Sequence, residues 1–446
     1  MAIIKIKNQA IDLDAAEIPN LPATKITSGT FDNARISLDA AEIPNLDTAK
    51  ITTGTLADAR VPDLNASKIT AGTITDARLP ANALNSNVSV PNQSAFKNII
   101  QNGDMSIAQR GTSATGLTNG SGGYHTCDRW RFTENGSPSF QFTQSQSTDV
   151  PTGQGFATSL KMDVTTADTS LAAADGLKIE QRIEGQMLQY LKKGTSSAES
   201  TTLSFWVKSN KTGTYICQLR DVDNSRSISK SYTISSANTW EKKTITYPGD
   251  TSGAFGNDNA SSLQFALWLG AGSNYSSGTL GTTWSAEVNA NRAVGQVNLA
   301  DNTSNEWYVT GVQLEAGTTA SDFEFLPVDV NLQRCQRYFY KLIDVPIGDS
   351  GGYFTSGFLY SSSTLYSWNE FPTMMRAAPT LSSSNGTDYF IFYRDGAGDN
   401  FNYLDLTLGR TNGAMIRNNA NISGTAGQTG GLHTTSNSKV TFSAEL

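Results

Sequence analysis

Two stretches decide the fold, LSFWVKS at 203–209 and TYICQLRD at 214–221, because apolar and polar residues alternate along each of them. Alternation with a period of two, rich in β-branched and aromatic residues, is typical of strands that bury one face. The same pattern recurs in KKTITYP at 242–248, LQFALWL at 263–269 and EWYVTGVQLE at 306–315, with short polar turns between the runs. We therefore predict a β-sandwich of jelly-roll type over residues 98–327.

The composition favours an all-β protein throughout. Of the 446 residues, 38% are hydrophobic and 16% are charged, and 39 are Gly. Ser, Thr, Asn and Gly make up much of the remainder. These residues disfavour helices, because the side chains of Ser, Thr and Asn compete for the backbone hydrogen bonds and Gly is flexible, and Thr also fits a pleated strand. Short strands joined by tight turns are the structure that such a chain predicts.

Charge and cysteine content exclude several classes of function. The formal net charge of -7 excludes a nucleic-acid partner that is bound through clustered Lys and Arg. No apolar run is long enough for a membrane helix or a secretory signal, so we expect synthesis in the cytoplasm. Cys127, Cys217 and Cys335 lie far apart and come with only two His, which gives no zinc spacing and predicts buried thiols. We expect no cofactor.

The first part of the chain contains repeats. Residues 18–36, 43–61 and 61–79 each contain a KIT tripeptide followed by Gly-Thr and Ala-Arg. Phe31 and Phe96 are the only aromatic residues in 1–97, so one copy cannot bury enough apolar surface to fold alone. We predict that three chains wind together into a fibrous shaft over 18–80, which makes the protein a homotrimer. Disorder of this segment is the alternative.

The repeats KITSGTFDNARI at 25–36 and KITAGTITDARLP at 68–80 resemble the shaft repeats of bacteriophage tail fibres. NIIQNGDMSIAQRGTS at 98–113 and WYVTGVQLEAG at 307–317 resemble the opening and the close of a domain common in such fibres. The resemblance implies a virion component that attaches to a bacterial surface glycan such as lipopolysaccharide, or to another outer-membrane receptor. It also implies that the amino terminus docks onto a tail, adaptor or baseplate protein.

These patterns divide the chain into six parts. They are a tail-docking segment at 1–17, the shaft at 18–80, a linker at 81–97, the sandwich at 98–327, a helical connector at 328–342 and a β-rich tip at 343–446. In the connector, Val330, Cys335 and Tyr338 could share one face of a short helix. The tip is the part richest in aromatic residues and lies farthest from the docking end, so we place receptor binding there.

Four aromatic residues of the tip are candidates for glycan contact: Tyr353, Tyr360, Tyr366 and Trp368. The last two lie in SSSTLYSWNE at 361–370, where Ser, Asn and Glu surround them, as expected of an exposed stacking platform. In contrast, Trp130, Trp206 and Trp307 lie inside strand-like runs and are expected in the core.

Two alternatives are a structural virion fibre or adaptor without its own receptor site, and a polysaccharide-degrading tailspike. The second needs a pair of carboxylates, which Asp221 and Asp223 or Asp395 and Asp399 could supply. Each pair lies among Gly or Asn, which is typical of a turn, and we expect no enzyme. Asp395 and Asp399 are also the candidates for a metal site, although their loop lacks the spaced acidic ligands of an EF-hand.

Overall fold

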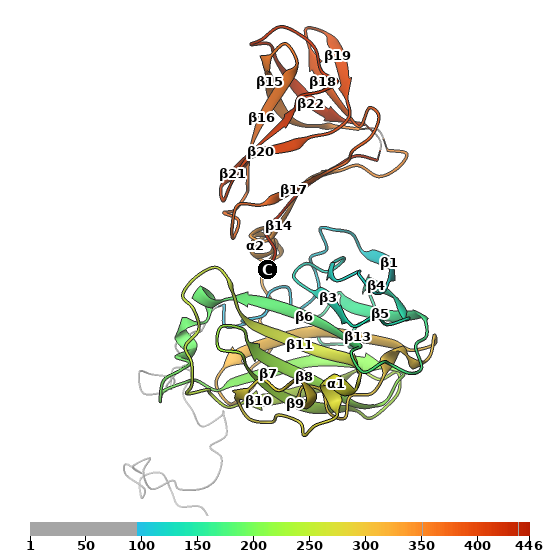
Figure 1. Cartoon of the computed structure of the whole chain (residues 1–446), viewed down its shortest axis with the longest axis vertical. Coiled ribbons are helices and arrows are strands. Elements are labelled where there is room, and N and C mark those ends of the chain that lie inside the picture. The colour runs from blue at the N-terminus through green and yellow to red at the C-terminus, as the bar shows by residue number, and fades with distance from the viewer. Residues whose placement is uncertain (1–95, 350, 436) are drawn as a thin grey trace, which may run out of the picture. The chain divides into compact units, whose positions relative to one another are not determined.

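The computed structural model describes residues 96–349, 351–435 and 437–446, and Figure 1 shows that strands dominate them. The all-β prediction is therefore confirmed for this part of the chain. The predicted docking segment, the shaft and all but the end of the linker lie outside the described residues. No helix in the described part is long and apolar enough to cross a membrane.

Two antiparallel sheets form the sandwich. One has the strand order β1-β4-β5-β13-β7-β10 and the other β12-β9-β8-β11-β6-β3-β2. All five runs that the sequence marked as strands in this region are strands. The bounds are β1 Ser113–Leu117, β2 Gly123–Tyr124, β3 Arg131–Asn135, β4 Gln141–Ser147, β5 Ser159–Thr166, β6 Gly176–Glu184, β7 Thr201–Ser209, β8 Gly213–Asp221, β9 Arg226–Ile234, β10 Glu241–Tyr247, β11 Ser261–Ala271, β12 Ser285–Ala286 and β13 Glu306–Ala316.

The topology of the sandwich is that of a jelly roll. Strands β5-β13-β7-β10 lie in one sheet and β6-β11-β8-β9 in the other, which is the order that two nested Greek keys produce. Side chains at alternate positions, such as Phe205 of β7 and Phe265 of β11, are fully buried in one shared core. The α-helix α1 (Ser273–Ser276) and the short 3-10 helices lie in the connections (Gly185–Met187, Gln189–Leu191, Asn289–Asn291 and Leu299–Asp301).

The core contains most, but not all, of the side chains expected there. Trp130 and Trp307 are fully buried, and the three cysteines are free and buried, as predicted. Trp206 is only partly buried, so its assignment to the core is wrong. Its neighbours Phe205 and Val207 take the inward positions of β7, and the pleat turns Trp206 to the outer face, opposite Lys242.

The predicted helical connector is shorter than expected. The helix α2 spans Val328–Gln336, and the chain then enters strand β14 (Phe339–Asp344). Tyr338 is fully buried, and β14 pairs with β23 (Lys439–Ser443) near the carboxyl end of the chain. Pairing with a distant strand overrides the local helical pattern here, so residues 339–342 belong to a strand rather than to the connector.

The C-terminal strands form two further antiparallel sheets around a second core. The smaller has the order β14-β23-β17 and the larger β19-β18-β22-β15-β16-β21-β20. Leu359, Leu365, Phe392 and Leu432 are fully buried in this core. The remaining bounds are β15 Tyr353–Ser361, β16 Thr364–Glu370, β17 Thr380–Ser383, β18 Phe390–Arg394, β19 Ala397–Phe401, β20 Asp405–Arg410, β21 Gly413–Asn418 and β22 Thr429–Thr434.

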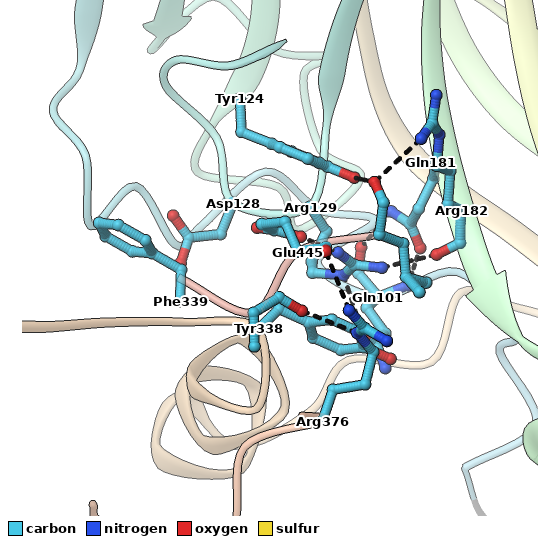
Figure 2. A network of polar contacts seen from close by, with 12 residues as sticks. Gln101, Tyr124, Asp128, Arg129, Gln181, Arg182, Tyr338, Phe339, Arg376 and Glu445 are labelled. Atoms are coloured by element: carbon cyan, nitrogen blue, oxygen red, sulfur yellow. Dashed lines mark hydrogen bonds and ion pairs between the residues drawn. The ribbon is translucent and has the colours of Figure 1, made fainter. Parts of the chain in front are cut away.

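A buried polar network joins the end of the chain to the sandwich (Figure 2). Glu445 accepts a hydrogen bond from Arg129 and another, 3.0 Å long, from Arg110. The Arg129 guanidinium also lies 3.4 Å from the centre of the Tyr338 ring. Arg376 donates to the backbone oxygens of residues 444 and 445 at 2.8 and 3.1 Å. Each of these charged side chains makes at least one hydrogen bond within the network, which identifies it as a structural connection.

Candidate functional site

The aromatic face is the exposed side of the large C-terminal sheet, on strands β15, β16, β18 and β22, which are neighbours in that sheet (Figure 1). Alternate residues of β15 and β16 point into the core and out to solvent, and a register shift between Tyr353 and Thr355 keeps Tyr353 on the outward face. Those positions carry an unusual number of rings. The aromatic face consists of Tyr353, Phe358, Tyr360, Tyr366, Trp368, Tyr393 and His433.

Strand register brings these rings into two groups. Phe358 lies opposite Tyr366 in the β15–β16 pair, and their ring centres are 6.2 Å apart, with Tyr360 5.4 Å from Tyr366. On the other side, the His433 ring lies 5.5 Å from Tyr353 and 4.7 Å from Tyr393. All the contacts are tilted or edge-on, which is the preferred arrangement of aromatic pairs and leaves ring faces free.

The exposure of these side chains is high for aromatic residues. The relative exposure is 67% for Tyr360, 57% for Tyr353, 45% for Tyr393 and 39% for Trp368. Large apolar groups gathered on one exposed face mark an interaction site more often than scattered ones do. The face is therefore the strongest candidate for a binding surface within the described residues.

Glycines hold several of the rings flat against the sheet. A Cβ atom placed on Gly431 would lie 2.9 Å from the Tyr353 ring, and one on Gly413 would lie 2.6 Å from Trp368. These rings therefore occupy space that a neighbouring side chain would otherwise fill. Aromatic rings that cover glycines in this way are a known device for stabilising sheets. Here the glycines also leave room for Tyr353 and Trp368 to lie close to the sheet.

A shallow hollow of about 390 Å³ lies beside Phe358 on strands β15 and β22. Its lining comes from Ser356, Gly357 and Phe358 of β15 and from Thr429 and Gly430 of β22. The Tyr353 hydroxyl is 2.5 Å from the Ser356 hydroxyl, so one of the two can donate to the other. The hydroxyl groups of Ser356 and Thr429 and the ring of Phe358 thus border the depression.

The structure brings together the four aromatic residues singled out in the sequence, and adds three that were missed. Tyr353, Tyr360, Tyr366 and Trp368 all lie on the aromatic face. Phe358, Tyr393 and His433 were not singled out. For Phe358 the signal was present, because it lies two residues before Tyr360 on the same strand. His433 and Tyr393 are joined to the group only by strand pairing, which a single sequence does not reveal.

The predicted carboxylate pairs serve the fold. Asp395 and Gly396 form the tip of the β18–β19 hairpin with φ of 50° and 76°, the backbone of a two-residue turn. Asp399 accepts hydrogen bonds from Arg394 at 3.3 Å and from the backbone N–H of Ser423 at 3.0 Å. Within 96–349, 351–435 and 437–446, no three His, Cys, Asp or Glu side chains are grouped to hold a metal ion.

The other pair is likewise tied into the structure. Asp221 is fully buried, and its carboxylate lies 2.5 Å from the Lys193 ammonium group. Asp223 accepts a hydrogen bond from the backbone N–H of Gly256 at 2.8 Å. Both carboxylates therefore hold loops of the sandwich in place.

No family model and no curated protein matches the chain. Among solved structures, it is similar to the enzymatically active domain of tailspike protein 4 of bacteriophage CBA120, at 16% identity and a TM-score of 0.27, over 49% of this chain and 21% of that one. A putative sugar binding protein from Bacteroides thetaiotaomicron is 12% identical, with a TM-score of 0.27 and coverages of 49% and 99%. The chain thus spans about a fifth of the tailspike structure.

Carbohydrate-binding modules are also among the similar structures. A family 11 module from Clostridium thermocellum, solved with a mixed-linked tetrasaccharide, is 11% identical, with a TM-score of 0.24 and coverages of 47% and 98%. The expectation that this chain is not an enzyme is contradicted, because a structure similar to it is named as an enzymatically active domain. We withdraw that expectation.

Proposed function

We propose that this chain is a tail fibre protein of a bacteriophage virion and that its aromatic face binds a glycan of the host surface. The observation that carries the proposal is the set of exposed, glycine-seated rings on β15, β16, β18 and β22. The tail-fibre resemblance of 25–36, 68–80, 98–113 and 307–317 supports the assignment to a virion.

The chemistry of the face suits a sugar chain. A pyranose ring presents apolar C–H groups on its faces, which pack on an aromatic ring, and hydroxyl groups around its edge. Rings such as Trp368 and Tyr353 supply the apolar surface, and the hydroxyls of Ser356 and Thr429 in the hollow supply hydrogen-bond partners. The hollow on the aromatic face is shallow and open, which predicts weak binding at each site.

Trimer formation would convert weak sites into firm attachment. We propose that the shaft over 18–80 joins three chains, and that residues 1–17 dock onto a tail, adaptor or baseplate protein. Three linked sites can raise avidity by roughly 10²–10⁴ over a single site without any new contact. Host attachment at a shallow aromatic surface is then compatible with a low affinity for free oligosaccharide.

The direct test is binding of the purified full chain to host cells and to immobilised lipopolysaccharide. Retention on cells that carry the polysaccharide, and loss of retention on cells stripped of it, would support the proposal. If the protein binds neither host cells nor lipopolysaccharide but still assembles onto virus particles, the chain is a structural fibre and the proposed receptor function is wrong.

A further inference from the structure

A charged cleft of about 410 Å³ lies on the outer face of the sandwich, far in sequence from the aromatic face. Its floor is formed by β3, β6, β8 and β11, and the segment that contains α1 and the 3-10 helix Asn289–Asn291 lines one side. Its lining is almost entirely polar. The lining residues are Arg131, Thr133, Glu134, Asn135, Lys178, Glu180, Arg182, Arg220, Gln264, Tyr275, Asn289 and Arg292.

Strand alternation explains how so many charges meet there. In β6, Leu177, Ile179 and Ile183 belong to the core, so the pleat turns Lys178, Glu180 and Arg182 to the other face. The register then places Arg131 opposite Glu180, and Gln264 opposite both Arg182 and Arg220. Side chains from strands far apart in sequence therefore line one surface.

Positive charge exceeds negative charge in this cleft. Glu180, which is only 1% exposed, is shared by three cations, Lys178 and Arg182 at 3.0 Å and Arg131 at 3.4 Å. Glu287 is shared by Arg220 at 2.6 Å and Arg292 at 3.8 Å. With Glu134 in the lining, five cations face three carboxylates. The cleft is therefore positively charged although the whole chain has a net charge of -7.

The titration behaviour of the cleft agrees with uncompensated positive charge. Burial opposes the charged form of Glu180, but the nearby Lys178 and Arg182 outweigh it and hold the pKa of Glu180 at about 2. Burial lowers the pKa of Arg292, and the neighbouring Arg220 lowers it further. A bound anion would relieve the repulsion between these guanidinium groups.

We propose that this cleft is a second binding site, and that it takes an acidic oligosaccharide whose sugars carry carboxylate groups. The guanidinium groups of Arg131, Arg220 and Arg292 would hold the carboxylates, because Arg presents paired N–H donors that match them. Gln264, Asn289 and Thr133 offer amide and hydroxyl groups to sugar hydroxyls. A polyphosphate fits less well, because Glu134 and Glu180 repel a dense run of negative charge.

Isothermal titration of the full chain with tetragalacturonate tests the proposal, with maltotetraose and inorganic triphosphate as comparison ligands. We expect binding of tetragalacturonate that weakens as salt rises, and little heat with maltotetraose. Substitution of one cleft arginine, in Arg220→Gln or Arg131→Gln, should weaken binding by about tenfold or more. The control Lys242→Gln removes a cation from the exposed edge strand β10 and should bind like the original protein.

A further variant should strengthen binding, and its result does not depend on whether the two arginine variants fold well. Glu287→Gln removes the carboxylate that pairs with Arg220 and Arg292, so tetragalacturonate should bind more tightly to it. The proposal is overturned if tetragalacturonate gives no heat, if neither the Arg nor the Glu287 substitution changes its affinity, or if maltotetraose or triphosphate binds as tightly. Variants of the aromatic face that no longer attach to cells should still bind tetragalacturonate. The two measurements therefore test the two sites separately.

Discussion

Arg129 of the sandwich and Glu445 of the C-terminal segment form a buried ion pair, although 316 residues separate them in the sequence. Their side chains are 1% and 8% exposed. Burial opposes the charged form of Arg129, yet the Glu445 carboxylate outweighs it and keeps the pKa of Arg129 above its usual value. Arg129 therefore keeps its positive charge, and Figure 2 shows how Tyr338 and Arg376 lie around the pair.

Removing one member of this pair should destabilise the protein strongly. Glu445→Ala leaves the Arg129 guanidinium buried without its anion, and we expect a loss of about 3–5 kcal/mol in the free energy of unfolding. The double variant Arg129→Met with Glu445→Met should lose less, because no buried charge remains unpaired. Denaturant unfolding measures both variants. Equal losses in the single and double variants would contradict this account.

The acid sensitivity of the sandwich should depend on Glu180. The folded pKa near 2 is below the ordinary value of 4.5, so the ionised carboxylate stabilises the fold at pH above about 4.5, and this contribution disappears as pH falls toward 2. The difference corresponds to about 3 kcal/mol. Unfolding curves of Glu180→Gln should therefore depend less on pH in this interval than those of the original protein.

Glu199→Gln is the matched control for that measurement. Glu199 pairs with Lys192 at 2.7 Å, but both side chains are at least 40% exposed, so the pair contributes little. This control should keep the full acid dependence. If Glu180→Gln keeps it as well, the charge cluster of the cleft does not stabilise the sandwich.

Local patterns were enough to predict five strands of the sandwich, namely β7, β8, β10, β11 and β13. The runs at 203–209, 214–221 and 263–269 alternate in the way that a half-buried strand requires, and each lies in β7, β8 or β11. Strand β6 was missed because GLKIEQRIE contains four charged residues, which strands usually avoid. Their presence makes sense only once the cleft is known, since its charges come from strands whose pairing the sequence does not specify.

The same limit applies to the tip. Polar surroundings correctly indicated that Trp368 is exposed, and alternation links Tyr360 to Phe358. The contact of His433 with Tyr353 and Tyr393 depends on pairing across β18, β22 and β15. Long-range pairing also decided where the helical connector ends, because β23 pairs with the chain from Phe339 onward.

Residues 98–446 should fold without the repeats. Nearly all the aromatic residues lie in this part, and both cores are built from residues after 97. A truncated protein that starts near residue 92 should be soluble and should melt in a cooperative transition, which calorimetry can record. It should also fail to assemble onto virus tails. Aggregation, or melting without a transition, would show that the shaft is needed for folding.

The seating of Tyr353 on Gly431 can be tested with a single methyl group. In Gly431→Ala the new Cβ would meet only side-chain atoms, Tyr353 at 2.9 Å and His433 at 3.5 Å, so the ring must tilt away from the sheet while the backbone stays in place. We expect a melting temperature close to that of the original protein and severalfold weaker attachment to host cells. Gly352→Ala is the control, since nothing lies within 4 Å of its new Cβ; equal attachment of the two variants would remove Tyr353 from the binding surface.

Replacing Tyr366 and Trp368 together with Ala should abolish attachment to host cells. The two side chains lie on one exposed strand face, with Trp368 39% exposed, so the core of the tip should tolerate their loss. In a trimer the change removes the stacking surface from all three sites at once. The gain in avidity over a single site, about 10²–10⁴-fold, is lost with it. Trp240→Ala, which changes a partly exposed Trp of the sandwich, is the matched control and should attach normally. Light scattering of the double variant distinguishes the remaining explanations: a trimer that no longer attaches supports the aromatic face as the receptor site, whereas dissociation into monomers would show that these rings pack between copies of the chain.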